Sequence, residues 1–212
     1  MSTALSDIEK KKAGRPSDAA KREAILVAAS EAFFDRGFAA TSIEQVAADA
    51  GVSKVTIYNH FTDKRGLFAA SVERECEKMR GHFSIDTLGD GSIGERLGTL
   101  GAAMVAFMSR PEMVQFDRRI AAETAHDPTL GHAFLKAGPW RMKDAFTTWL
   151  AHACAQGELR IADPELAAEQ FVSMCKGIGD LERRFGAEPD EADTRRRIEG
   201  AVEVFLAAYA PS

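Results

Sequence analysis

The chain has 212 residues, of which 45% are hydrophobic and 28% are charged, as is typical of a soluble globular protein with one large or two small domains. It contains no run of 18 apolar residues, and its N-terminus lacks the apolar core of a signal peptide, so we expect no membrane span and a cytoplasmic location. The net charge of −5 argues weakly against nucleic-acid binding by the whole chain. However, residues 1–70 carry ten Lys/Arg against nine Asp/Glu, while the remainder carries 17 against 23.

Abundant alanine, few β-branched residues and only seven prolines favour an all-α fold, for which the pattern of start and stop signals predicts about nine helices. Residues 1–16 hold few apolar groups and one basic cluster, KKKAGRP, and are predicted to be a flexible basic arm. The first helix is expected to begin near Ser17 or Asp18, either of which can cap it, and to stop at Gly37.

The next elements are two short helices joined by a tight turn. Thr41 and Glu44 have the spacing of a capping box, with Thr41 as the predicted N-cap. The segment 51–61, GVSKVTIYNHF, contains residues that would suit a strand, but Ser53 can cap a helix there and packing can override the small propensity cost. With a turn around Gly51, residues 42–61 are predicted to form a helix-turn-helix.

The second helix of this unit is expected to bury Ile57 and to expose the opposite face. Ammonium, hydroxyl and amide groups on such a face can address base edges and phosphates in a major groove. We place Lys54, Thr56, Tyr58 and Asn59 on that face, with His60 at its margin, Ser42 and Ser53 beside the phosphates, and Lys64 near the flanking backbone.

Further helices are predicted along the rest of the chain, with a glycine-rich loop at 81–92. Ser92 and Glu95 form a second capping box, Pro111 fits a first turn, and Asp163 followed by proline marks a clear helix start. The predicted ranges after the helix-turn-helix are 62–80, 92–110, 111–125, 139–156, 164–185 and 190–210, with short helical patterns between 128 and 138.

The region from 104 to 149 concentrates large apolar and aromatic side chains. An ordinary hydrophobic core is the default interpretation; the alternative is that some of them line a cavity for a small apolar or aromatic compound. The candidate pocket residues are Met104, Phe107, Met108, Phe116, Phe134, Trp140, Phe146 and Trp149.

The last two helices are both amphipathic. They could close the core of one chain, or meet a second copy in a four-helix interface. The inward residues predicted for the first of them are Ala167, Phe171, Met174, Cys175, Ile178 and Phe185, and those for the second are Ile198, Val202, Phe205 and Tyr209.

The scattered histidines match no metal-binding spacing, and no nucleophile elbow, phosphate loop or dinucleotide fingerprint is present. We therefore predict no metal, no cofactor and no enzymatic activity.

Residues 17–70, and above all RGFAATSIEQVAADAGVSKVTIYNHFTDKRGLF, resemble the TetR family of bacterial transcription regulators. The resemblance rests on AGVSK followed by Thr56, Tyr58, His60-Phe61, Lys64 and Leu67-Phe68, while Arg65 stands where glutamate is common. It implies a DNA-binding domain at 17–66, a ligand-binding and dimerisation domain at 67–212, and a basic arm for the minor groove.

The resemblance further implies a homodimer that binds double-stranded operator DNA of pseudo-palindromic sequence, that pairs through its last two helices, and that usually represses until a small-molecule effector releases it. Tilting of the fourth helix would carry the signal from the effector. The alternative is a helical protein-interaction or architectural module without sequence-specific DNA binding.

Overall fold

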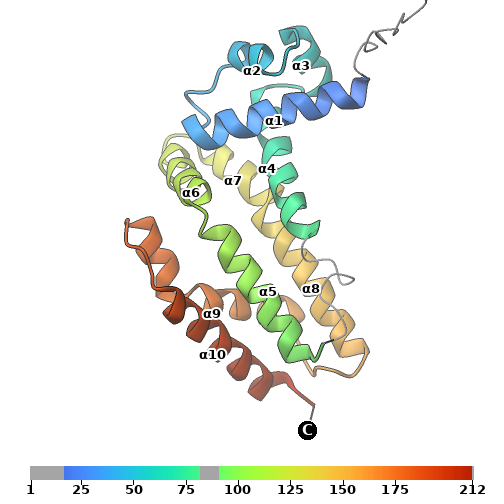
Figure 1. Ribbon diagram of the computed structural model, residues 1–212. Coiled ribbons are helices and arrows are strands. Elements are labelled where there is room, and N and C mark those ends of the chain that lie inside the picture. Colours follow the sequence, from blue (N-terminus) through green and yellow to red (C-terminus); the bar gives the residue numbers. More distant parts are fainter. Residues whose placement is uncertain (1–16, 82–90, 212) are drawn as a thin grey trace, which may run out of the picture.

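The computed structural model describes residues 17–81 and 91–211, which fold into ten helices and no strand (Figure 1). The predicted all-α class is confirmed. The helix count exceeds the expected nine because the short patterns after residue 127 form a separate helix, α7 (Pro128–Ala137). The basic arm and nearly all of the glycine-rich loop lie outside the described residues.

One end of the elongated molecule is built from α1 (Asp18–Arg36), α2 (Ile43–Asp49), α3 (Lys54–His60) and the start of α4 (Lys64–Gly81) (Figure 1). Ser17 caps α1, since its hydroxyl accepts a hydrogen bond from the amide of Ala20 at 3.1 Å. The chain then turns at Gly37 to begin the approach to the helix-turn-helix.

The predicted role of Thr41 as the cap of α2 is wrong. Ser42 caps this helix instead, and its hydroxyl accepts from the amide of Gln45 at 3.1 Å. The Thr41 side chain is buried, and its hydroxyl lies 3.0 Å from the carbonyl of Ala32 and 2.7 Å from that of Gly37. Thr41 thus ties the loop to the end of α1. It is available for this role because Ser42 caps α2.

The larger part of the molecule contains α5 (Ile93–Met108), α6 (Pro111–Thr124), α7, α8 (Pro139–Ala155), α9 (Pro164–Arg184) and α10 (Glu191–Tyr209). The predicted capping box is present: the amide of Ser92 donates to Glu95, and the Ser92 hydroxyl accepts from the Glu95 amide. Asp163 caps α9 through the amide of Leu166, with proline in the first turn as expected.

Two hydrophobic cores hold these helices together, and the boundary between them does not coincide with the domain boundary predicted at residue 66. The first contains the helix-turn-helix and α4, but it also contains Phe116 and Ile120 of α6 and Leu130 and Ala137 of α7. The second joins α5, α8, α9 and α10 around Phe171. The helix α6 is therefore packed into the end of the molecule that holds the helix-turn-helix, although it follows α5 in the chain.

The helix α9 bends at Gly177, whose backbone angles (φ 47°, ψ −151°) are not helical and suit only glycine. Before the bend, Ala167, Phe171 and Cys175 are buried as predicted. After it, the buried position moves to Gly179, and Arg197 of α10 packs against the bend.

The prediction that Ile178 and Phe185 point inward is therefore wrong. Ile178, next to the bend, is 58% exposed, and Phe185, the residue that caps the C-terminus of α9, is 84% exposed. In α10, where no such bend occurs, Ile198 and Phe205 are buried as expected.

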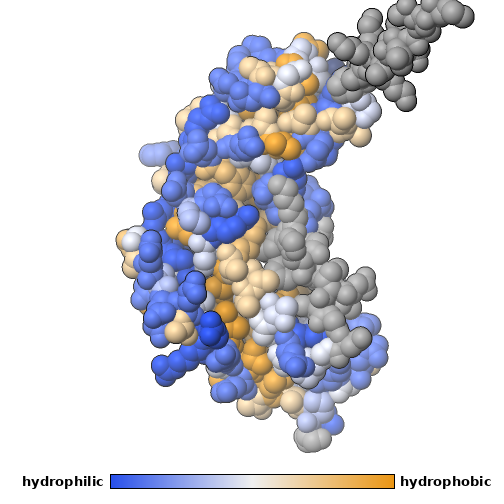
Figure 2. All heavy atoms as spheres, viewed as in Figure 1, coloured by the Kyte–Doolittle hydropathy of each residue, from blue (hydrophilic) through white to orange (hydrophobic). Residues whose placement is uncertain are grey.

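Hydrophobic residues also reach the surface. Figure 2 shows a hydrophobic strip over α5 and beside α10, in the half of the molecule away from the helix-turn-helix. An open groove of about 1210 Å³ follows these two helices and the turn between α9 and α10.

Candidate nucleic-acid interface and effector cavity

The helix-turn-helix has the geometry that its sequence predicts. Gly51 takes a positive φ of 65° in the turn, and the amide of Val52 donates to the carbonyl of Ala47 at 2.9 Å. Ser53 caps α3 through the amide of Thr56 at 3.1 Å, and Ile57 is fully buried against the first core. Residues 54–60 of the sheet-prone segment therefore form a helix, which the Ser53 cap and the buried Ile57 stabilise.

The face of α3 opposite Ile57 is exposed. Tyr58 is 51% exposed, Asn59 is exposed beside it, and the hydroxyl of Thr56 lies 2.9 Å from that of Ser53. Val55 is also on this face, with 67% of its surface exposed. The groove-facing residues predicted from the sequence did not include it. An apolar side chain that no core requires could have been noticed in the sequence, because a methyl group can contact thymine in a major groove.

Lys54 is not free in this structure. Its ammonium group lies 2.6 Å from the carboxylate of Glu44 on α2, and both side chains are exposed. The hydrogen bond from Lys54 lowers the pKa of Glu44, and the same bond raises the pKa of Lys54. The two helices of the motif are thus joined by an ion pair on the face that would meet DNA.

The other two basic candidates are turned toward the protein. His60 is largely buried and lies 3.4 Å from Asp18 at the start of α1. The Lys64 ammonium sits 4.5 Å above the ring of Phe38 and donates to the carbonyl of Ala39 at 3.3 Å. Burial lowers the pKa of Lys64, an effect that the charge of Glu123 opposes.

A cavity of about 540 Å³ lies between α4, α5, α6, α7, α8 and α9. Seven of the eight candidate pocket residues are on its wall: Met104, Phe107, Met108, Phe116, Phe134, Trp140 and Phe146. Trp149 is not, because it is buried in the second core beside Phe146, with Arg96 over its ring. The volume and the apolar lining are those of a small-molecule site.

One end of this cavity is polar, a feature that the sequence pattern did not reveal. Asp117 of α6 lies 3.0 Å from Arg184 of α9, and Asp180 lies 3.5 Å from Arg184 and 3.3 Å from Lys176. Arg183 borders both the cavity and the groove along α5. Lys176, Asp180 and Arg184 follow one another at i, i+4 spacing on α9, but Asp117 reaches them only because α6 crosses α9, which spacing along the chain does not show.

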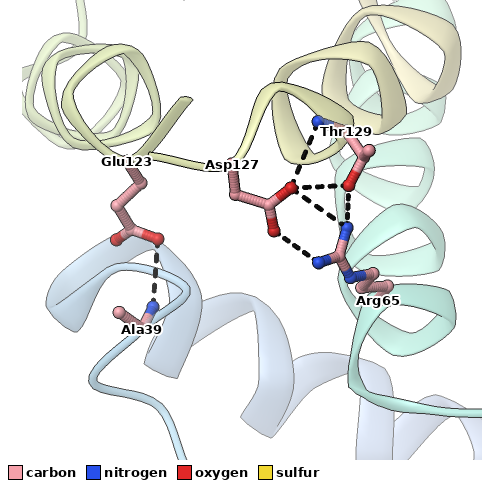
Figure 3. A network of polar contacts seen from close by, with 5 residues as sticks. All are labelled: Ala39, Arg65, Glu123, Asp127 and Thr129. Atoms are coloured by element: carbon pink, nitrogen blue, oxygen red, sulfur yellow. Dashed lines mark hydrogen bonds and ion pairs between the residues drawn. The ribbon is translucent and has the colours of Figure 1, made fainter. Parts of the chain in front are cut away.

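Polar contacts connect α6 and α7 to α4 and to the loop that precedes the helix-turn-helix. Glu123 accepts a hydrogen bond from the amide of Ala39 at 3.0 Å, just before the helix-turn-helix (Figure 3). Nearby, Arg65 of α4 forms an ion pair with Asp127 and donates to Thr129, so the residue that departs from the family pattern has its partners on α7 (Figure 3).

A second contact of the same kind is made by Arg119, whose guanidinium donates to the carbonyl of Phe34 at 2.7 Å and to that of Asp35. The helix that lines the cavity is thereby fixed to the end of α1 at two points. The helix α6 therefore lines the cavity on one side and contacts the loop before the helix-turn-helix on the other.

Two negative observations complete the description. Among residues 17–81 and 91–211, no group of three or more His, Cys, Asp or Glu side chains is placed to hold a metal ion. Within the same residues, no helix is long and apolar enough to cross a membrane.

Comparison with known proteins agrees with this architecture. The family model described as "Bacterial regulatory proteins, tetR family" matches residues 25–71. The model described as "AefR-like transcriptional repressor, C-terminal domain" matches residues 95–211, which is more than half of the chain. The chain belongs to the TetR family of transcription regulators, which combine a DNA-binding helix-turn-helix with a ligand-binding C-terminal domain and are mostly repressors.

Individual relatives support the same assignment. The transcriptional activator FasR of Mycolicibacterium smegmatis is 41% identical over 59 residues, which are 28% of this chain and 27% of FasR. The structure of a protein described as a TetR-family regulator from Mesorhizobium loti is 29% identical, with a TM-score of 0.78 over 93% of this chain and 100% of that one. The flavonoid-responsive regulator FrrA is 31% identical, with a TM-score of 0.74 over 91% of this chain and 98% of FrrA.

Proposed function

We propose that the protein is a homodimeric repressor that binds a pseudo-palindromic operator and is released by a small apolar or aromatic effector. The observation that carries this proposal is the outward face of α3, where Tyr58, Asn59 and Val55 are exposed around a single buried anchor. Binding to the chromosome would place the protein in the cytoplasm.

In this proposal residues 17–66 are the DNA-binding domain, and α3 is the helix that enters the major groove. Thr56, Tyr58 and Asn59 would contact base edges and phosphates, and the Ser42 and Ser53 hydroxyls would lie beside the phosphate backbone. Lys54 would exchange Glu44 for a phosphate on binding. His60 and Lys64 would act from the margin, since both already have partners within the protein.

Dimerisation is proposed through the last two helices. Beyond the bend in α9, Ile178, Leu181 and Phe185 are exposed, and Val204 is exposed on α10. Apolar side chains of this size on adjacent helices mark an interaction surface. Two copies would present two α3 helices, and a spacing of about 34–36 Å between them would match successive major grooves.

The effector is proposed to occupy the cavity of about 540 Å³. The name of FrrA describes that relative as responsive to flavonoids, which are aromatic compounds, and this supports an aromatic effector here. A ligand there would touch α4 through Val72 and α6 through Phe116, so it could shift both helices relative to α1. Such coupling requires that the ligand prefers the state that does not bind DNA.

The alternative of a purely architectural or protein-binding module is not favoured by the family assignment. The family consists of regulators, and the absence of enzymatic activity in this chain stays a prediction.

The test is binding of purified protein to the DNA upstream of its own gene, measured by fluorescence anisotropy at several salt concentrations. Specific binding with a salt-dependent affinity is expected. Asn59→Ala should weaken it by about tenfold, since a good base contact contributes about 1–3 kcal/mol. Gln156→Ala, which removes an exposed amide at the end of α8, is the control. Equal affinity of the two variants would reject the assignment of α3.

The dimer is tested separately by light scattering. Leu181→Glu should give the mass of a monomer, whereas Val55→Glu should keep the dimer and lose DNA binding. A Leu181→Glu variant with the wild-type mass would reject the proposed interface.

A further inference from the structure

Charged side chains line the cavity where α6 meets the C-terminal part of α9. Three cations, Lys176, Arg183 and Arg184, lie there with two carboxylates, Asp117 and Asp180. The cavity is also lined by Lys143 and Glu169, which form their own ion pair, and by Glu75, which pairs with Arg74. The carboxylates are already engaged, since Asp117 pairs with Arg184 and Asp180 pairs with both Arg184 and Lys176. Arg183 is the cation that these two carboxylates leave without a partner.

Arg183 has no other polar partner for its side chain among the described residues. Its Nη2 atom is buried and has no hydrogen-bond partner among the described residues. No ion pair of Arg183 is formed within residues 17–81 and 91–211 either. Arg183 also lines the cavity, so an anion bound there would give its guanidinium the ionic partner that the described residues do not supply.

The rest of the wall is of a different character. Phe107, Phe134, Trp140 and Phe146 offer rings, and Met104 and Met108 offer flexible thioethers that adapt to flat apolar bodies. A neutral hydrocarbon would fill this part and leave Arg183 unpaired. A molecule with one apolar body and one acidic group would satisfy both parts of the cavity.

We infer that the effector is an aromatic or apolar acid whose anionic group is bound by Arg183 and whose body lies between Phe107, Phe134 and Trp140. This inference rests on the proposed function, because it specifies the compound that occupies the same cavity. It also gives the ligand a lever on α6. An anion beside Arg184 would compete with Asp117, one of two residues of α6 with a polar contact to α9; the other is Arg118, which donates to the carbonyl of Arg183.

A pair of matched probes tests the inference: 2-naphthoate and its neutral counterpart 2-naphthamide, titrated into the full-length protein by isothermal calorimetry. The wild-type protein should bind the carboxylate about tenfold more tightly than the amide, as expected for a charge-assisted hydrogen bond. Arg183→Gln should remove this preference and leave the affinity for the amide unchanged. Arg196→Gln, which removes an exposed arginine of α10, should keep the preference.

Equal binding of the two probes by the wild-type protein, or no binding of either, overturns the inference. A carboxylate preference that survives in Arg183→Gln also overturns the inference. If that variant keeps the preference but is a monomer, the buried Nη2 atom of Arg183 serves the subunit interface and not the ligand. Failure of the proposed function is seen separately, as the absence of specific binding to the upstream DNA in the same protein. Release of that DNA by the amide alone would keep the proposed function and reject the anionic effector.

Discussion

Glu123 of α6 accepts a hydrogen bond from the backbone amide of Ala39 at 3.0 Å, and this contact joins the helix that lines the cavity to the loop that leads into the helix-turn-helix (Figure 3). The same carboxylate lies close to Gly37, where a side chain would meet it at 2.6 Å. The loop is therefore held from the C-terminal side of the molecule as well as by Thr41 from within.

The contact predicts a local change in hydrogen exchange. In Glu123→Gln the amide of Ala39 loses a charged acceptor, so exchange in residues 37–41 should become about two- to tenfold faster. Glu112→Gln, an equivalent change at the other end of α6, is the control. Mass spectrometry of peptic fragments measures both. Unchanged exchange in Glu123→Gln would show that the hydrogen bond does not hold the loop.

The ion pair between Lys54 and Glu44 predicts an increase in DNA affinity on removal of the acid. Glu44→Gln frees the ammonium group for a phosphate and removes a negative charge facing the duplex, so affinity should rise by about two- to fivefold. The slope of log affinity against log salt should steepen by about 0.9, the value for one additional phosphate contact. Anisotropy with the upstream DNA measures both quantities. The matched control is Glu31→Gln on α1, an exposed glutamate outside the motif. A slope equal to that of the wild type would show that Lys54 does not reach the backbone.

The contact between Arg65, Asp127 and Thr129 predicts a dependence on pH. The hydrogen bond from Thr129 and then the Arg65 guanidinium lower the pKa of Asp127 below its ordinary value of 3.8. The charged carboxylate therefore stabilises the folded state above that pH, and the contribution is lost as the pH falls below it. Asp127→Asn, which still caps α7, should melt a few degrees below the wild type at pH 7 and pH 5.

This difference in melting temperature should shrink as the pH falls through about 4 and lower. Asp144→Asn, at an exposed position of α8, should show no such convergence. A constant difference across the whole range would mean that Asp127 acts only as a helix cap.

The bend in α9 predicts that Gly177 is poorly replaceable. Gly177→Ala must adopt a backbone conformation that suits only glycine, with its methyl group 2.5 Å from Cδ of Arg197. We expect it to lower the free energy of unfolding by about 1–3 kcal/mol. Gly200→Ala in α10, where nothing lies within 4 Å of the added methyl group, should be neutral or stabilising by up to about 1 kcal/mol. Urea denaturation distinguishes them, and two equal stabilities would contradict the reading of the bend.

The bend also marks the limit of prediction from sequence. The helices, the helix-turn-helix and most caps follow from local rules, because a serine or aspartate side chain and the next few amides decide a helix start. The cap of α2 is the exception, since two adjacent hydroxyls compete for it and the burial of Thr41 leaves it to Ser42. The bend at Gly177 does not follow from such rules, because glycine tolerates both the helical and the bent conformation and Arg197, which packs against the bend, comes from another helix. Helical spacing alone therefore predicts the wrong side for Ile178 and Phe185.

The candidate site shows the same division. Periodicity could identify the aromatic residues of the cavity wall, but not that Trp149 packs one layer deeper, nor that Asp117 meets Arg184 across two helices. Those relationships depend on how α6 crosses α9. The groove-facing residues of α3 were predictable because a seven-residue helix with one buried anchor has one possible outward side.

The first core has a practical consequence for protein engineering. The first core includes Leu67, Phe68 and Val72 of α4 as well as Phe116, Ile120, Leu130 and Ala137 of α6 and α7, so a fragment ending at residue 66 would lack them all and leave α1 uncovered. Chimaeras that join this helix-turn-helix domain to another ligand-binding domain would therefore have to include α6 and α7. The two ends of the molecule should accordingly unfold in one thermal transition. A compound that binds in the cavity should then also raise the melting temperature of the helix-turn-helix.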